Sequence, residues 1–99
     1  MTIGSDDPCV VTVVHAPACH LCDDAEVVLA RLATRYPLVI DRIDIRTVAA
    51  QGLLRTHRPA MSPLVLIDGS YFSSGRLPRR KLARLLERRL AGAPVASRG

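Results

Sequence analysis

"VVTVVHAPACHLCDDA", the stretch from Val10 to Ala25, passes from a run of β-branched residues through a proline-containing break into a segment of helical spacing. The first five residues predict a strand that is buried on both faces. Beyond Cys22 the apolar residues recur every three or four positions, which predicts a helix, and two aspartates are expected in its first turn, where they favour the helix dipole. The residue before Pro37 leaves the helical region, so the helix is expected to end at Tyr36.

The next part of the chain repeats the alternation of strand and helix. Apolar and β-branched residues predict strands over 38–45 and 64–67. Between them, Thr47 is a suitable cap for a short helix over 48–55. The Asp-Gly pair at 68–69 predicts a hairpin turn directly after the third strand.

The last part of the chain predicts a returning strand at 71–72, a loop at 73–75 and a final helix that begins near Pro78 and ends at Gly92. The apolar stripe of this helix consists of Leu82, Leu85, Leu86 and Leu90. A helical crossover makes the first two strands parallel, and the hairpin makes the last two antiparallel. The order β-α-β-α-β-β-α therefore predicts an α/β fold, with a four-stranded mixed sheet flanked by helices on both faces.

The composition fits one small domain. Ninety-nine residues leave little room for a second core, and a hydrophobic share of 48% excludes a disordered chain. We expect the domain to span 9–91, with flexible termini at 1–8 and 92–99. No apolar run approaches the roughly 20 residues of a membrane-spanning helix, and "MTIGSDDP" lacks the layout of a secretion signal. We therefore expect a soluble, cytoplasmic protein without a membrane partner.

Basic residues are concentrated in the last predicted helix and contribute strongly to the formal net charge of +5. The cluster comprises Arg76, Arg79, Arg80, Lys81, Arg84, Arg88 and Arg89, opposed only by Glu87. Such a cluster could bind an anionic partner, but its plain interpretation is the solvated face of a helix. Because no aromatic residues accompany the cluster, nucleic acid is not an expected partner.

The Cys-His-Leu-Cys sequence lies at the predicted junction between strand and helix. A thiolate at Cys19 would face the positive end of the helix dipole and free backbone N–H groups, which lower its pKa. Cys22 is one helical turn away and can form a disulfide with Cys19. The pair can therefore attack a substrate disulfide through Cys19 and resolve the mixed disulfide through Cys22. A protonated His20 would favour the thiolate, whereas the aspartates at 23–24 would oppose it.

A metal site at Cys19 and Cys22 is an alternative interpretation. Zinc takes four ligands, so histidines would have to supply the other two. The candidates are His15, His20 and His57. The chain has no second Cys-x-x-Cys and no His-x-x-x-His pair, so we expect no metal. Cys9, at the start of the first apolar run, is interpreted as a small buried hydrophobic residue.

The segments "VTVVHAPACHLC" and "MSPLVLIDG" resemble those of glutaredoxin-like proteins of the thioredoxin-fold superfamily. The resemblance runs from Val10 to Leu90 and implies a thioredoxin-like fold, with a glutaredoxin-like domain over 9–91. It implies a cis-proline at Pro63 that faces the active-site disulfide. A substrate groove would then be formed by His20, Met61, Ser62 and Pro63, with the backbone of Ser62 pairing to an extended substrate.

The activity that the resemblance implies is thiol–disulfide exchange, with Cys19 as the nucleophile and Cys22 as the resolving thiol. No bound cofactor is implied, and a low-molecular-weight thiol, glutathione or another, is a candidate reductant. The expected partners are a disulfide-containing protein or mixed-disulfide substrate, and a thiol or reductase that donates electrons.

The sequence departs from this family pattern at several positions. Ala16 stands where glutaredoxins have a lysine, and "SSGRLP" lacks the aspartate that grips glutathione. Val13 stands where thioredoxins have a buried acid, and the Trp-Cys-Gly-Pro-Cys signature is missing. These departures leave the thiol partner open. They also leave an alternative function, a non-enzymatic binding module that docks through its basic C-terminal helix; metal binding at Cys19 and Cys22 ranks below it.

Overall fold

Seven elements follow one another in the predicted order β-α-β-α-β-β-α in the computed structural model, which describes residues 8–90. They are β1 (Cys9–His15), α1 (His20–Ala33), β2 (Leu38–Asp44), α2 (Val48–His57), β3 (Leu64–Ile67), β4 (Ser70–Ser74) and α3 (Arg79–Leu90). Apart from Pro8, the predicted flexible termini lie outside the described residues, as does the predicted end of the last helix at Gly92.

The four strands form one mixed sheet in the order β2-β1-β3-β4. Strand β1 pairs with β2 in parallel and with β3 in antiparallel orientation, and β3 and β4 form the antiparallel hairpin. The hairpin turn lies at the predicted Asp-Gly pair, where both residues have positive φ, 49° at Asp68 and 86° at Gly69. Glycine adopts this region without steric cost, and aspartate tolerates it, which explains the turn. The predicted α/β architecture is confirmed.

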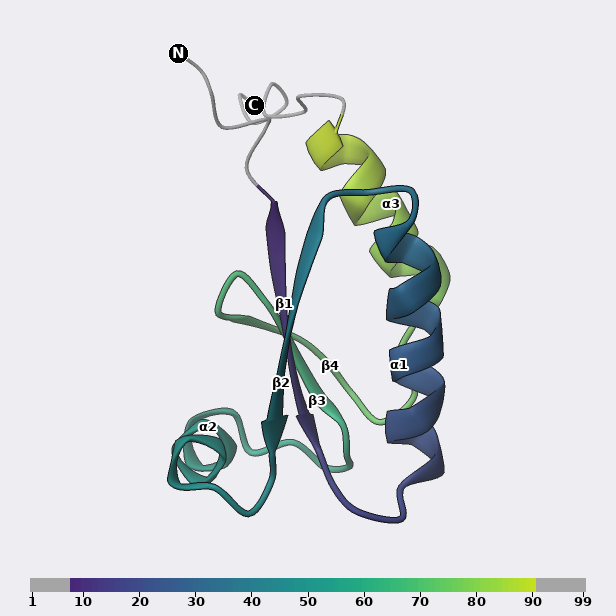
Figure 1. The fold of residues 1–99 in the computed structure, drawn as a ribbon. Helices are drawn as coiled ribbons and strands as arrows, with labels where there is room; N and C mark the ends of the chain where they lie inside the picture. Colours follow the sequence, from purple (N-terminus) through teal and green to yellow (C-terminus); the bar gives the residue numbers. More distant parts are fainter. Residues whose placement is uncertain (1–7, 91–99) are drawn as a thin grey trace.

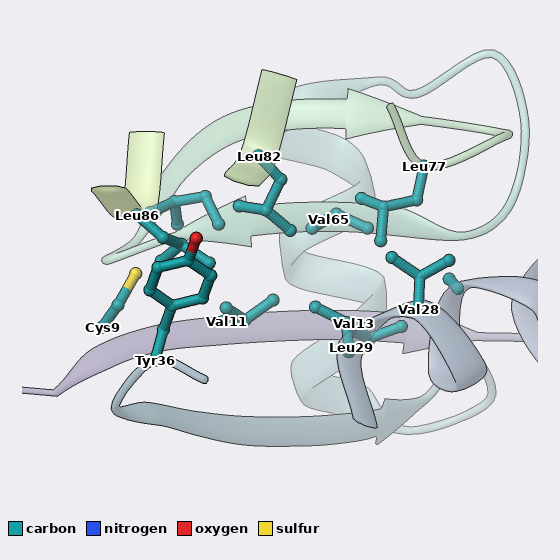
Figure 2. Close-up of a cluster of buried hydrophobic side chains, with 12 residues drawn as sticks. Cys9, Val11, Val13, Val28, Leu29, Tyr36, Val65, Leu77, Leu82 and Leu86 are labelled. Atoms are coloured by element: carbon teal, nitrogen blue, oxygen red, sulfur yellow. The ribbon is translucent and has the colours of Figure 1, made fainter. Parts of the chain in front are cut away.

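The sheet separates two apolar layers, with α1 and α3 on one face and α2 on the other (Figure 1). The larger layer, drawn in Figure 2, packs residues of the central strands against α1 and α3. Its buried members are Cys9, Val11, Val13, Ala25, Val28, Leu29, Tyr36, Val65, Ile67, Leu77, Leu82 and Leu86. The smaller layer, under α2, contains Val14, Ala50, Leu64 and Leu66. Strand β1 is therefore buried on both faces over 11–14, whereas Val10, predicted to be buried with these residues, is exposed over 37% of its surface.

Helix α1 differs from its predicted bounds at both ends. It begins at His20 and ends at Ala33, three residues before the predicted end at Tyr36, and only Asp23 of the two aspartates lies in its first turn. The end is set by Thr34, whose hydroxyl donates to the carbonyl of Arg31 at 2.7 Å. Tyr36 instead turns into the larger apolar layer.

Several further bounds differ from the predictions, by one residue at the end of β2 and at the start of β4 and by more at two other ends. Ser73 and Ser74, expected in a loop, belong to β4 because they pair with Val65 and Leu64 of β3. Helix α2 continues two residues beyond its predicted end and stops at Arg58, which adopts a left-handed conformation with φ of 46°. Within residues 8–90, no helix combines the length and the apolar character needed to cross a membrane.

Candidate active site

The pairing of β1 with β3 brings two distant segments together. Val14, near the end of β1, is opposite Leu64, the first residue of β3. Because the two strands are antiparallel, the segment that enters β3 at Pro63 lies beside the segment that leaves β1 toward the cysteines. The Ser62–Pro63 peptide bond is cis, which agrees with the resemblance.

Cys19 is the N-cap of α1. Its backbone is extended, with φ of −117° and ψ of 107°, and its sulfur accepts a hydrogen bond from the N–H of Cys22 at 3.1 Å. Serine, threonine, aspartate and asparagine usually take this position, because their oxygens satisfy a free N–H at the start of a helix. Here the half-buried sulfur takes that role, so it lies at the positive end of the helix dipole.

Cys22 lies one turn further into the helix and is buried, with 3% of its surface exposed. It forms a disulfide with Cys19, and the two Cα atoms are 5.2 Å apart. The N–H of Ala16 lies 3.5 Å from the Cys22 sulfur, to which it can donate a weak hydrogen bond. Cys19 is thus partly accessible to solvent, whereas Cys22 is enclosed by the chain.

The segment before β3 lies against the accessible sulfur. The carbonyl oxygen of Ser62 is 4.0 Å from the sulfur of Cys19. Pro63 is buried, whereas Met61 is exposed over 56% of its surface. His20, directly after Cys19, is also exposed. The structure therefore brings Ser62 to the dithiol, with Met61 and Pro63 as its chain neighbours, and leaves His20 exposed at the start of α1.

Two residues that sequence analysis did not place at the site also contribute to its shape. Gly75 donates its N–H to the carbonyl of Pro63 at 3.1 Å, and a Cβ at Gly75 would lie 3.4 Å from Met61. Its φ of 82° favours glycine as well. Ala18, directly before Cys19, has a φ of 51°. The glycine after the paired serines was a signal for Gly75, whereas no residue pattern marks Ala18.

At this end of the sheet, an acidic side chain forms an ion pair with an arginine. Asp44, at the end of β2, is opposite His15 at the end of β1. Arg46 donates to its two carboxylate oxygens at 2.9 and 2.7 Å and holds the pKa of Asp44 well below its usual range. The ion pair with Arg46 therefore favours the charged form of Asp44.

The structure offers no metal cluster in the residues it describes. Across 8–90, no group of three or more His, Cys, Asp or Glu side chains is arranged to hold a metal ion. The candidate ligands lie on separate elements, with His15 at the end of β1, His20 at the start of α1 and His57 at the end of α2. The zinc alternative thus gains no support from the described part of the chain.

Cys9 lies far from the dithiol, at the opposite end of β1. It is a free cysteine with 2% of its surface exposed, packed in the larger apolar layer. Burial raises the pKa of the Cys9 thiol above its ordinary value of 9.0. Its interpretation as a small buried hydrophobic residue is confirmed.

Solved structures with the same fold include two thioredoxins. A mutant thioredoxin of Halobacterium salinarum NRC-1 superposes with a TM-score of 0.62 at 24% identity, covering 84% of this chain and 75% of the thioredoxin. The germline-specific thioredoxin Deadhead of Drosophila melanogaster superposes with a TM-score of 0.62 at 20% identity, covering 85% of this chain and 83% of Deadhead. At these identities the likeness shows the fold, which is thioredoxin-like.

Sequence comparison gives the family. A search of curated protein sequences finds no significant match. The family profile described as a glutaredoxin-like domain (DUF836) matches residues 10–87, which include both cysteines of the disulfide and Pro63. The chain therefore belongs to the glutaredoxin-like domain family (DUF836).

Proposed function

We propose that this protein is a thiol–disulfide oxidoreductase that reduces or exchanges disulfides, with Cys19 as the attacking thiol and Cys22 as the resolving thiol. The observation that carries the proposal is the unequal access to the two sulfurs of one disulfide: Cys19 is half-buried at the helix start, and Cys22 is buried. This difference in access supports a first attack through Cys19, followed by resolution through Cys22.

The reaction begins from the reduced dithiol. The Cys19 thiolate attacks one sulfur of the substrate disulfide, the substrate S–S bond breaks, and the other substrate sulfur leaves as a thiolate that takes a proton. The Cys22 thiol then loses its proton and attacks the sulfur of Cys19, which releases the second substrate thiol. Two electrons have passed to the substrate, and the Cys19–Cys22 disulfide has formed, which is the state of the structure.

The surroundings of Cys19 support its role as the nucleophile. The N–H of Cys22 and the dipole of α1 both stabilise a negative charge on its sulfur, which lowers a thiol pKa. The nearby backbone of Ser62 supports binding of an extended substrate beside the sulfur, in the manner of an added strand. In this proposal His20 and the segment from Met61 to Pro63 line the substrate groove.

The electron donor belongs to the same proposal. A dithiol reductase or a low-molecular-weight thiol would return two electrons to the Cys19–Cys22 disulfide after each turnover, and no bound cofactor is needed. A reducing compartment such as the cytoplasm keeps such donors available, so we place the protein there.

A disulfide-reduction assay tests this proposal. Purified protein is supplied with insulin or a glutathione mixed disulfide as substrate and dithiothreitol as donor. We expect Cys19→Ser to reduce the rate to the uncatalysed background, because the attacking thiolate is lost. Cys22→Ser should lose insulin reduction and retain the first attack, while Cys9→Ala, the matched control, should keep the activity. A Cys19→Ser rate equal to that of the unchanged protein would reject the oxidoreductase and leave the non-enzymatic binding module.

A further inference from the structure

Helices α1 and α3 cover the same face of the sheet (Figure 1). Residues of α1, of the segment that follows it and of α3 line an open groove there. Its volume is about 250 Å³. The floor is apolar and consists of Val28, Leu32 and Ala83. The rim carries four arginines, Arg31 and Arg35 from the α1 side and Arg79 and Arg80 from α3. Residues almost 50 positions apart in the sequence thus bring four guanidinium groups around one apolar hollow.

The rim has no opposing charge. The ion pairs of the described residues involve Arg42, Arg46 and Arg89, and none of the rim arginines has a carboxylate within ion-pair distance across 8–90. All four rim arginines are exposed. Like charges around a shared hollow repel one another, so this arrangement costs stability unless an anionic group enters it.

The position of two rim arginines in their helix strengthens this argument. Arg79 and Arg80 are the first residues of α3, whose first turn contains no acidic residue. Positive charge at a helix N-terminus opposes the helix dipole, whereas acidic residues there are stabilising. These two arginines therefore work against the local stability of α3, and such a departure from local stability is expected at functional sites.

We propose that this groove binds an acidic segment of a partner protein, with one apolar side chain on the floor and carboxylates on the arginine rim. Arginine pairs with carboxylates through two parallel hydrogen bonds, which gives the rim its selectivity. The volume lies below the roughly 300 to 1,000 Å³ that is typical of small-molecule pockets, and it suits one large side chain. No aromatic residue lines the groove, so nothing in it would stack with the bases of a nucleic acid.

The groove is separate from the dithiol. Arg31 follows Cys22 by nine residues on the same helix, which corresponds to roughly 13 Å along the helix axis. A segment bound there leaves Cys19 accessible, and the proposal does not depend on the reduction activity. It differs from a general attraction to the basic face of α3, because it requires arginines of both helices and the apolar floor.

Fluorescence anisotropy with three labelled probes tests this proposal on the full chain. The first probe is the peptide Asp-Glu-Phe-Glu-Asp, the second has serine in place of phenylalanine, and the third is a single-stranded oligonucleotide of equal charge. We expect the first peptide to bind at least about tenfold more tightly than the second, because only phenylalanine buries its side chain on the floor. The oligonucleotide should bind more weakly than the first peptide.

Two double variants with the same change in charge separate the groove from the rest of α3. Arg31→Glu combined with Arg80→Glu should weaken binding of the first peptide at least about tenfold, because two charge-assisted contacts are replaced by repulsion. The control pair is Arg84→Glu with Arg88→Glu, which lies on α3 but outside the groove. It should weaken binding of the first peptide less than about threefold. Neither pair should change disulfide reduction, and the thermal midpoint should confirm that both variants fold.

Three results would overturn the proposal. Equal losses in the two double variants would show attraction to diffuse charge. Equal binding of the phenylalanine and serine peptides would show that the floor has no role. Tighter binding of the oligonucleotide than of the first peptide would assign the arginines to nucleic acid instead.

Discussion

The two ends of strand β1 lead to two cysteines in contrasting surroundings. Cys9 begins the strand and is packed in the larger apolar layer, where burial raises the pKa of its thiol. Cys19 follows the other end of the strand and caps α1, where its sulfur accepts a backbone N–H and remains partly accessible. Burial favours the neutral thiol, whereas a helix N-terminus favours the thiolate. We therefore expect the reactivity of each cysteine to depend on its position in the fold.

The largest expected difference between the two ends is in the rate of alkylation. In the reduced protein at pH 7, we expect iodoacetamide to modify Cys19 at least about 100-fold faster than Cys9, because only Cys19 is both accessible and favoured as a thiolate. Mass spectrometry of digested samples taken over time would give both rates. Comparable rates at the two residues would contradict the expected difference in reactivity between Cys19 and Cys9.

A charge beside Cys19 should reduce this difference without removing either cysteine. His20→Glu places a negative charge next to the cap, which raises the pKa of Cys19 and should slow its alkylation about threefold to tenfold at pH 7. The neutral variant His20→Gln is the matched control, and it should change the rate far less. If both variants gave the same rate, electrostatics at the helix start would not govern this thiol.

At the buried end, the expected effect is on stability alone. Cys9→Ala removes the sulfur from the apolar layer and should lower the free energy of unfolding by about 1 kcal/mol, as small truncations in a core do. Disulfide reduction should be unchanged. Urea unfolding of the reduced protein and the reduction assay measure the two quantities, and a loss of activity at constant stability would assign Cys9 a chemical role.

The smallest expected effect is the pH dependence of the contribution that Cys9 makes to the free energy of unfolding. Because the pKa of Cys9 in the folded protein is raised above 9.0, the neutral thiol stabilises the fold fully below pH 9, and this stabilisation is lost as pH rises through the folded pKa. The difference in unfolding free energy between the unchanged protein and Cys9→Ala should therefore decrease above pH 9. Tyr36 is present in both proteins and does not affect the difference. A difference that grew with pH would contradict the predicted direction of this pH dependence.

The order of the elements and the place of the dithiol were predictable, because both follow from local patterns. The β-branched run, the helical spacing after Cys22 and the Asp-Gly pair each determine structure over a few residues. The polar pair Ser73 and Ser74 was misassigned to a loop, because a strand that pairs with β3 need not be apolar. Tyr36 continued the helical spacing, yet it packs in the core beyond the end of α1.

Features that depend on the packing of distant elements were not predictable from these patterns. The 4.0 Å approach of Ser62 to Cys19 depends on the antiparallel pairing of β1 with β3, and the family resemblance, not periodicity, indicated it. The hydrogen bond from Gly75 to Pro63 and the left-handed conformation of Ala18 leave no signal in spacing. The basic residues of α3 were visible, but the groove needs Arg31 and Arg35 from another part of the chain.

The most direct test of the account is to identify which sulfur captures a substrate. A Cys9→Ala/Cys22→Ser double variant retains only Cys19, and a Cys9→Ala/Cys19→Ser double variant retains only Cys22. Each reduced protein is mixed with a peptide disulfide, and the mixed disulfide is mapped by mass spectrometry. We predict rapid capture by the variant that retains Cys19 and little by the variant that retains Cys22. Equal capture, or faster capture by Cys22, would contradict the assignment of Cys19 as the attacking thiol.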